Sequence, residues 1–591
     1  MTNACLALAN NDIAYIFWKL DQKITGCLGF SVRRVGANGK TTALPAFVGF
    51  EPGQPGKPHA MRNTDVWPVQ SFQWKDVFAT PGSYSYQIVP MMGPDVRALT
   101  PHPTIVLTSN QVSISGDYGD MAAYFNVGLI STQAVTRKIH ALVNNGTYTN
   151  ITTALRSEIA KEGSPIRKQL CGEVLDKGVL SLLNKATTSG GFCHLALYEL
   201  TDQQLLKAIL SLAAKQQLAL CLSNADTSES YKGTDGKTHT RKIVDGTNAE
   251  SRKTLHAAGV AVTDRFVPSS SIGHNKFVVW SDATGPQEVL TGSTNWTATG
   301  LCSQTNNALI IRNKTVASGY KVYWEKLVRD AALQRPQGQA LRTWCGHASV
   351  DAALDSGSNI SVWFSPNTAK KTKDAETPPP DLTQVFDLIH TAQQGVLFLA
   401  FNPGTPSFIE EVYNKAVQMQ DANLAFYVRG AVTDPAPLGQ FATFITKRSA
   451  TAAPDVLVSG VGGVPDDFGY WEKELFKLGH AVIHDKIIVI DPFSPDCVVV
   501  TGSHNLGYKA SYQNDENLVI VRGHQRLAQA YAAHVLDVTN HFSWRYKLSQ
   551  LARDGKMERA WGDLSNTDGW QNKYFDGTSD ASRDGFFFFG G

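Results

Sequence analysis

The sequence predicts an α/β protein in which two duplicated α/β sandwich lobes follow an all-β sandwich domain. Three observations lead to this class. Residues 1–115 alternate apolar and polar side chains between turns rich in Gly, Pro and Asn. Residues 120–345 and 346–548 instead alternate helical segments with short buried strands. One sequence motif also occurs twice, once in each of these two later regions.

Size, charge and cysteine usage narrow the class of protein. The chain has 591 residues, which suggests about three to five compact units. Its net charge of +2 argues against a protein that binds nucleic acid over its whole surface, but it is compatible with a local basic cleft. No apolar run reaches the roughly 18 residues of a membrane span, and the N-terminus lacks the basic start of a signal peptide. Because the eight cysteines are scattered without a CxxC pair, we expect a cytoplasmic protein, with signal-less secretion as the alternative.

The N-terminal domain, residues 1–115, is predicted to be a β-sandwich. Residues 83–89 alternate cleanly and lie between Pro81-Gly82 and Met92-Gly93-Pro94, which mark turns. The pattern of this region resembles an immunoglobulin- or fibronectin-type module. Such modules usually serve as spacers or binding platforms, so we expect this domain to lie outside the chemistry.

Both lobes carry a strand–helix–strand unit. In the first lobe we expect a strand at 194–200, a helix that begins after Asp202 and runs to 214, and a strand at 218–222. The second lobe repeats this order at 395–401, 407–418 and 424–428. Units of this kind imply parallel strands joined by right-handed crossovers. The remaining residues, 549–591, are predicted to form a polar C-terminal tail.

The repeated motif combines His-x-Lys with a later Gly-Ser-x-Asn. The first copy contains His274 and Lys276, followed by Gly292-Ser293-Thr294-Asn295; the second contains His484 and Lys486, followed by Gly502-Ser503-His504-Asn505. The step from His to Gly is 18 residues in both copies (274 to 292 and 484 to 502), and the step from Gly to a downstream Asn is 15 (292 to 307 and 502 to 517). Matched offsets with identical residue types indicate two homologous halves.

These residue types suit phosphoryl chemistry. In an extended His-x-Lys, both side chains point to the same face, so one phosphate can meet an imidazole and an ammonium together. Imidazole can act as a nucleophile, base or acid near neutral pH. Lys and Asn supply donors for the negative oxygens of a pentacovalent phosphorus. Two such halves facing each other would allow one His to attack the phosphorus while the other protonates the leaving oxygen.

The motif HxKx4D followed by GSxN resembles that of the phospholipase D superfamily of phosphodiesterases and phosphatidyltransferases. The motif is complete in the second copy and nearly complete in the first, and the resemblance covers roughly residues 120–545. It implies two lobes that build one active site without a metal ion or other cofactor. It also implies a covalent phosphohistidine that water or an alcohol resolves.

The resemblance also assigns roles to residues. It makes His274 the nucleophile and His484 the general acid/base, with four phosphate clamps and two supporting serines: Lys276, Lys486, Asn295, Asn505, Ser293 and Ser503. Glu516 resembles the family carboxylate that orients a motif His, and Asp491 and Asp282 resemble its structural Asp. The first copy departs from the pattern, because Ser281 stands where Asp belongs and Asn306 stands where the second copy has Glu516. We therefore expect the two histidines to have unequal environments.

Three functions remain open at this stage. The first is hydrolysis or transphosphatidylation of phospholipid head groups, with a phospholipid or membrane surface as partner and water or an alcohol as acceptor. The second is a metal-independent nuclease acting on DNA or RNA, for which the basic loop at 231–242 could contact phosphates. The third is a non-catalytic module that binds phosphate or another anion. The sequence leaves the oligomeric state open, although a monomer suffices for one site.

Overall fold

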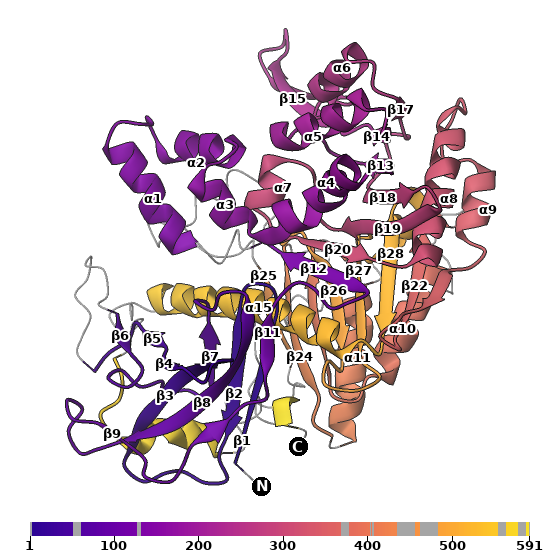
Figure 1. Cartoon of the computed structure of the whole chain (residues 1–591). Helices are drawn as coiled ribbons and strands as arrows, with labels where there is room; N and C mark the ends of the chain where they lie inside the picture. The colour runs from indigo at the N-terminus through magenta and orange to yellow at the C-terminus, as the bar shows by residue number, and fades with distance from the viewer. Residues whose placement is uncertain are drawn as a thin grey trace.

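The computed structural model describes residues 3–50, 61–126, 132–367, 378–401, 403–404, 407–422, 424–433, 456–460, 483–553, 563–576 and 587–589. Within these residues, the N-terminal region, two lobes and a long C-terminal helix can be followed along the chain (Figure 1).

The described N-terminal region is built from two antiparallel sheets and a short antiparallel pair of strands, β5 and β6. One sheet has the order β1-β2-β7 and the larger one is built along β10-β8-β3-β4, with β9 and β11 also pairing with β8. The strands are β1 (Ala4–Ala9), β2 (Ala14–Lys19), β3 (Cys27–Gly36), β4 (Thr41–Ala43), β5 (Pro45–Ala46), β6 (Arg62–Asn63), β7 (Gln73–Asp76), β8 (Gly82–Met92), β9 (Thr100–Pro101), β10 (Leu107–Thr108) and β11 (Val112–Ile114). The predicted all-β region is thus confirmed, whereas its resemblance to an immunoglobulin or fibronectin module stays a prediction.

The first lobe is organised around a sheet of seven strands in the order β12-β20-β19-β18-β13-β14-β17. Its strands are β12 (Met121–Phe125), β13 (Phe192–Leu197), β14 (Leu218–Ser223), β17 (Val262–Arg265), β18 (Lys276–Asp282), β19 (Gly285–Gly292) and β20 (Asn307–Ile311). The pairs β13–β14 and β14–β17 are parallel, and the other neighbours are antiparallel. This sheet therefore contains the parallel strands that the sequence predicted.

The second lobe repeats this sheet. Its eight strands have the order β21-β22-β28-β27-β26-β23-β24-β25. The last seven strands of this order occupy the positions of the seven strands of the first sheet, and β21 is added at one edge. The strands are β21 (Val350–Ala353), β22 (Asn359–Phe364), β23 (Gly395–Ala400), β24 (Tyr427–Val432), β25 (Val456–Gly460), β26 (Lys486–Ile490), β27 (Val498–Gly502) and β28 (Asn517–Arg522). Again only the β23–β24 and β24–β25 pairs are parallel. The duplicated α/β fold is confirmed.

Helices cover both faces of each sheet, which explains the continuous apolar strands. In β26, Ile487 and Val489 join the core shared by the two lobes, while Ile488 and Ile490 point to the opposite face. The first lobe carries α1 (Thr132–Asn144), α2 (Ile151–Ala160), α3 (Pro165–Cys171), α4 (Leu180–Ser189), α5 (Gln203–Ala214), α6 (Ala249–Ala257), α7 (Ala298–Cys302), α8 (Lys314–Ala331) and α9 (Gln339–Cys345). The second carries α10 (Pro380–Thr391), α11 (Phe408–Asp421), α14 (Tyr508–Gln513) and α15 (Gln525–Arg553).

The two lobes share one hydrophobic core. Apolar side chains of α8 and α15 fill it together with the inner faces of both sheets. Figure 1 shows α15 passing between the N-terminal strands and the second sheet, and Tyr15 and Phe17 of β2 join the same core. The half-sites are therefore held on a rigid common support rather than on a flexible linker.

Several elements differ from the sequence-based expectation. Strand β24 begins at Tyr427, three residues later than expected, and residues 424–426 are not part of the strand. The basic loop forms a hairpin of β15 (Thr227–Lys232) and β16 (Thr238–Ile243). Helix α15 runs past the boundary expected at 548–549, and a 3-10 helix at Asp568–Tyr574 packs on the N-terminal region through Trp570.

Among the described residues, no helix is long and apolar enough to cross a membrane.

Candidate active site

The two His-x-Lys motifs lie at the start of equivalent strands. Lys276 is the first residue of β18 and pairs with Leu197 at the end of β13, while Lys486 begins β26 and pairs with Ala400 at the end of β23. Each motif is also tied to the other lobe, because the backbone N–H of His484 donates to the carbonyl of Thr305 at 3.2 Å and that of Asp515 donates to the carbonyl of Ile272 at 3.0 Å. The fold thus brings both motifs to one interface.

The glycine of each Gly-Ser-x-Asn segment permits a close backbone approach. Gly292 has a φ of +135° and Gly502 a φ of +125°. A Cβ at either position would lie 2.4 Å from the backbone oxygen of Asn307 or Asn517, respectively. This contact gives a structural reason for the constant step of 15 residues in the sequence, because the Gly and the Asn meet across neighbouring strands.

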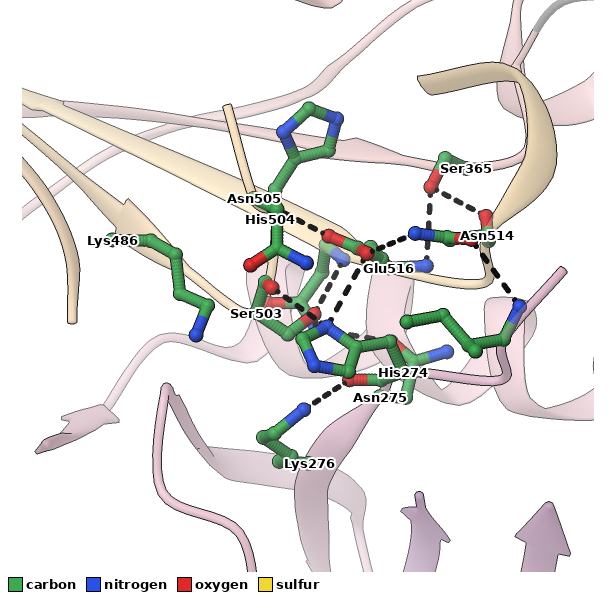
Figure 2. Close-up of polar contacts among 12 residues, drawn as sticks. His274, Asn275, Lys276, Ser365, Lys486, Ser503, His504, Asn505, Asn514 and Glu516 are labelled. Carbon is green, nitrogen blue, oxygen red and sulfur yellow. Dashed lines mark hydrogen bonds and ion pairs between the residues drawn. The ribbon is translucent and has the colours of Figure 1, made fainter. Parts of the chain in front are cut away.

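His274 of the first lobe meets a carboxylate of the second. Its Nδ1 lies 3.2 Å from Oε1 of Glu516 and 3.1 Å from the carbonyl oxygen of Ser503 (Figure 2). Because both neighbours accept hydrogen bonds, Nδ1 carries the proton and Nε2 presents its lone pair. Glu516 is held in turn by the side chain of Asn514 at 2.7 Å and the backbone N–H of Asn505 at 2.8 Å.

His484 of the second lobe meets a neutral amide of the first. Its Nδ1 donates to Oδ1 of Asn306 at 2.8 Å. The orientation of this amide is fixed, because Nδ2 of Asn306 donates to the carbonyl of Gly300 at 2.7 Å. The imidazole centroids of His274 and His484 are 6.2 Å apart. The two histidines therefore face each other with one charged and one neutral supporting partner.

Burial governs the charges of both histidines. It lowers the pKa of His274 to about 4, with a further lowering by Lys276 and an opposing effect of Glu516. It also lowers the pKa of His484 well below its usual value, assisted by Lys486 and Lys276. Burial by itself would raise the pKa of Glu516, but contact with His274, His504 and Asn514 lowers it to about 2. Near neutral pH the protein thus holds neutral imidazoles and an ionised Glu516.

The two motif lysines lie in the same buried environment. Each Nζ donates to the carbonyl oxygen of its own motif histidine, Lys276 to His274 at 2.7 Å and Lys486 to His484. Burial lowers the pKa of Lys276 to about 7, against the opposing charges of Glu516 and Glu199. The pKa of Lys486 is lowered well below its usual value by burial and by Lys276. A bound phosphate would favour the charged form of both lysines.

The serines and asparagines of the two segments take different positions. The hydroxyl oxygens of Ser293 and Ser503 accept from the backbone N–H groups of Asn307 at 3.0 Å and Asn517 at 3.1 Å, so both serines fix the strand crossing. Asn295 donates through Nδ2 to Oε2 of Glu199 at 2.7 Å. In the described structure, the Oδ1 atoms of Asn295 and Asn505 are buried without a hydrogen-bond partner.

The residue between His and Lys links the lobes in both copies. Asp485 accepts from Nδ2 of Asn307 at 2.9 Å and contacts His534 of α15 at 2.9 Å. In the other copy, Oδ1 of Asn275 accepts from Nδ2 of Asn517 at 3.1 Å. Spacing shows that Asn307 and Asn517 are equivalent, but their contacts with the opposite motif depend on tertiary structure.

Three further site residues follow the strands beside the motif strands. Tyr198 follows β13, its ring lies 5.2 Å from that of His274, and Nζ of Lys276 lies 5.4 Å from its centroid. Phe401 follows β23 and occupies the same position beside His484, at 5.3 Å, with Nζ of Lys486 also 5.3 Å from its centroid. Glu199 comes directly after Tyr198. The sequence offered one signal for the two aromatics, since both fall in the first strand of the predicted strand–helix–strand unit of their lobe, at 194–200 and 395–401.

The two structural aspartates differ in position. Asp491 accepts from three successive backbone N–H groups, those of Gln393, Gln394 and Gly395, at 2.7 to 2.9 Å, and so fixes the start of β23. In the first lobe a β-bulge at Trp280/Ser281 displaces the chain, and Asp282 lies exposed in the β18–β19 turn, where it binds Thr284 and Gln287. Asp282 therefore does not repeat the contacts of Asp491.

Residues 179–328 and 470–537 match the family described as "Cardiolipin synthase, PLD-like domain". These two segments contain both His-x-Lys motifs and both Gly-Ser-x-Asn segments. These two segments together therefore resemble a PLD-like domain.

Solved structures of similar shape include three enzymes. Phosphatidylserine synthase of Haemophilus influenzae Rd KW20 has 13% identity and a TM-score of 0.41, over 64% of this chain and 92% of that one. The phospholipase D family member Nuc of Salmonella typhimurium has 17% identity and a TM-score of 0.21, over 31% and 94%. Yeast tyrosyl-DNA phosphodiesterase has 9% identity and a TM-score of 0.28, over 57% and 84%. Among curated proteins, none matches the sequence.

Proposed function

We propose that this protein is a metal-independent phosphodiesterase of phospholipase D type that hydrolyses or transphosphatidylates phospholipid head groups. The observation that carries the proposal is the convergence of the two half-sites, with the rings of His274 and His484 6.2 Å apart. Lys276 and Lys486 accompany them, so that a phosphodiester between the rings would meet two imidazoles and two ammonium groups. Such a set can attack the phosphorus and protonate the leaving oxygen in one in-line step.

The unequal partners of the two histidines support separate roles. When Nε2 of His274 attacks the phosphorus, its ring gains positive charge, and the carboxylate of Glu516 on Nδ1 stabilises that charge. His484 lacks a carboxylate partner, which keeps its imidazolium a stronger acid for the leaving oxygen. In the second step His484 takes a proton from water or an alcohol, which attacks the phosphohistidine and releases His274.

Substrate binding would supply the protonation state that this cycle requires. Near neutral pH the buried site favours neutral histidines, and burial lowers the pKa of both lysines. A phosphodiester anion raises the pKa of every cationic group beside it. Its arrival would therefore favour the charged forms of Lys276 and Lys486, and the proposed cycle requires in addition that His484 binds a proton while Nε2 of His274 stays unprotonated.

The test compares lipid and nucleic acid substrates in the presence of EDTA. The purified protein is incubated with mixed micelles of phospholipids or with single-stranded DNA, and phosphatidic acid and DNA fragments are measured. We expect phosphatidic acid, and phosphatidylethanol when ethanol is added, with the DNA left intact. DNA cleavage without lipid turnover would contradict the lipid substrate. Tight phosphate binding without any turnover would favour the non-catalytic module.

A nuclease is the second candidate, because the β15–β16 hairpin leaves the first lobe beyond β14. Tyr231 is 46% exposed, and Lys232, Lys237 and Arg241 are exposed around it. An aromatic ring among cations suits the stacking and phosphate contacts of a single strand. However, Arg241 pairs with Glu229 at 2.7 Å and His239 pairs with Asp235 at 2.9 Å, which reduces the positive charge offered to a polyanion.

A further inference from the structure

Glu199 is an acidic residue in a site that otherwise binds an anion. Glu199 directly follows Tyr198, whose ring centroid lies 5.4 Å from Nζ of Lys276, and the charges of Lys276 and Lys486 both act on the Glu199 carboxyl group. Among the described residues it forms no ion pair with Lys, Arg or His, and its one side-chain hydrogen bond comes from Asn295. A half-buried carboxylate without a cationic partner at ion-pair distance is unfavourable, and a phosphate beside it would be repelled. Burial correspondingly raises the pKa of Glu199, against the opposing effects of Lys276, Asn295 and Lys486.

Asn295 provides an independent observation beside Glu199. The side chain is 6% exposed, and its Nδ2 donates to Oε2 of Glu199 at 2.7 Å. When Glu199 is ionised it can only accept hydrogen bonds, and the amide of Asn295 then turns Nδ2 toward it. Oδ1 of Asn295 is then left buried without a donor. A carboxylate and a bare amide oxygen thus lie side by side, and both need a hydrogen-bond donor.

We propose that Glu199 and Asn295 form a subsite for a primary ammonium group carried by the substrate, so that the enzyme prefers ethanolamine-type head groups. This inference rests on the proposed phosphodiesterase function and names its substrate class. A primary ammonium offers three N–H donors and one positive charge, which satisfies Oδ1 of Asn295 and neutralises Glu199 together. In phosphatidylethanolamine only two carbon atoms separate this group from the phosphate ester, so its subsite has to lie beside the phosphate clamps.

Other common head groups fit these two acceptors less well. A trimethylammonium carries the charge but no N–H donor, so a choline ester leaves Oδ1 of Asn295 unpaired. A glycerol head group supplies donors without charge, and therefore leaves the Glu199 carboxylate uncompensated. A serine head group adds its own carboxylate, which Glu199 repels. The arrangement thus predicts discrimination at the ammonium nitrogen.

The experiment compares phosphatidylethanolamine, phosphatidylcholine and phosphatidylglycerol of identical acyl chains in the same detergent micelles. All three release phosphatidic acid, so one mass-spectrometric readout serves for each kcat/KM. For the full-length protein we expect a preference for ethanolamine over choline of about tenfold or more, the effect of a charged hydrogen bond. Glu199→Gln should reduce this preference to within about threefold, because the amide keeps the shape and removes the charge.

Glu250→Gln serves as the matched control, since Glu250 is an exposed acid on α6 of the same lobe. It should retain the wild-type preference. A second readout, independent of turnover, is the binding of O-phosphoethanolamine, O-phosphocholine and inorganic phosphate measured by calorimetry. Glu199→Gln should weaken phosphoethanolamine at least about tenfold more than phosphate.

Equal turnover of the three lipids by the wild-type protein would overturn the subsite, as would a preference that survives in Glu199→Gln. Selective binding of phosphoethanolamine without any lipid turnover would retain the subsite and reject the proposed catalytic function. Equal binding of the three phosphate compounds would reject the subsite alone, because phosphodiester turnover would still be measurable in the micelle assay.

Discussion

The two half-sites share their motifs but not their electrostatics. His274 reaches across the lobe interface to the carboxylate of Glu516, whereas His484 reaches across it to the amide of Asn306. The sheets that carry them have equivalent strand orders, and both lysines contact the backbone of their own histidine. The duplicated fold therefore supplies geometry to both halves, and a single acid-to-amide difference distinguishes the two histidines, to which the proposed mechanism gives the roles of nucleophile and acid. The following predictions test this separation, beginning with the largest expected effect.

Removal of His274 should abolish turnover of all phosphodiesters. His274→Ala is expected to lose about ten-thousand-fold or more in kcat, as enzymes do when the nucleophile is removed. His484→Ala should lose as much on a lipid with a poor leaving group. It should, however, still release p-nitrophenol from bis(p-nitrophenyl) phosphate in the first step, because that leaving group needs no proton.

Steady-state and burst kinetics with both substrates provide the measurement. His256→Ala is the control, since this exposed histidine pairs with Asp264 outside the site. Wild-type turnover in His274→Ala would refute a shared site. Identical behaviour of the two histidine variants on both substrates would refute the separation of roles.

The second prediction concerns the loop that carries Glu516 to His274. Its neighbour Asp515 forms a buried pair with Arg265 of β17, with contacts of 2.5 and 3.1 Å. Asp515→Ala should lower the free energy of unfolding by about 3–5 kcal/mol, because it leaves a buried guanidinium partly uncompensated. Arg241→Ala, which breaks an exposed pair with Glu229, should cost less than about 1 kcal/mol. Urea denaturation of both variants gives the comparison, and equal losses would show that the buried pair does not stabilise the lobe interface.

The third prediction uses the two aspartates of the motif. Asp491→Ala should reduce the free energy of unfolding by about 1–3 kcal/mol, since three backbone N–H groups before β23 lose their acceptor. Asp282→Ala should leave the denaturation midpoint unchanged, because its contacts are confined to an exposed turn. Equal losses in the free energy of unfolding of the two variants would show that Asp282 stabilises its lobe as Asp491 does, despite the β-bulge.

The fourth prediction is the pH profile of kcat/KM. Protonation of His274, whose pKa burial lowers to about 4, removes the nucleophile and sets the acidic limb. Deprotonation of Lys276, whose pKa burial lowers to about 7, weakens phosphate binding and contributes to the alkaline limb together with loss of the proton that His484 donates. Glu516 raises the pKa of both groups, so Glu516→Gln should move both limbs to lower pH. Limbs that stay in place in this variant would show that Glu516 does not act on the site's charges.

The sequence predicts which motifs come together better than it predicts their partners across the lobe interface. The steps of 18 and 15 residues identify the two copies of the motif, and the Gly–Asn contact across neighbouring strands gives a structural reason for the 15-residue step in each lobe. The sequence also predicts unequal histidines, since Asn306 replaces a Glu in one copy. It cannot show that Glu516 serves the histidine of the other lobe, which depends on how the two sheets meet. Glu199 escapes prediction for a similar reason, because its role depends on a tertiary contact with Asn295.

The most direct test of the account is to identify the histidine that becomes phosphorylated. His484→Ala is mixed with bis(p-nitrophenyl) phosphate, quenched in alkali, which preserves phosphohistidine, and digested for mass spectrometry. We predict one equivalent of released p-nitrophenol and a p-nitrophenyl phosphoryl adduct on the peptide that contains His274. An adduct on His484 in the His274→Ala protein, with none on His274 in the His484→Ala protein, would contradict the assignment of the two half-sites.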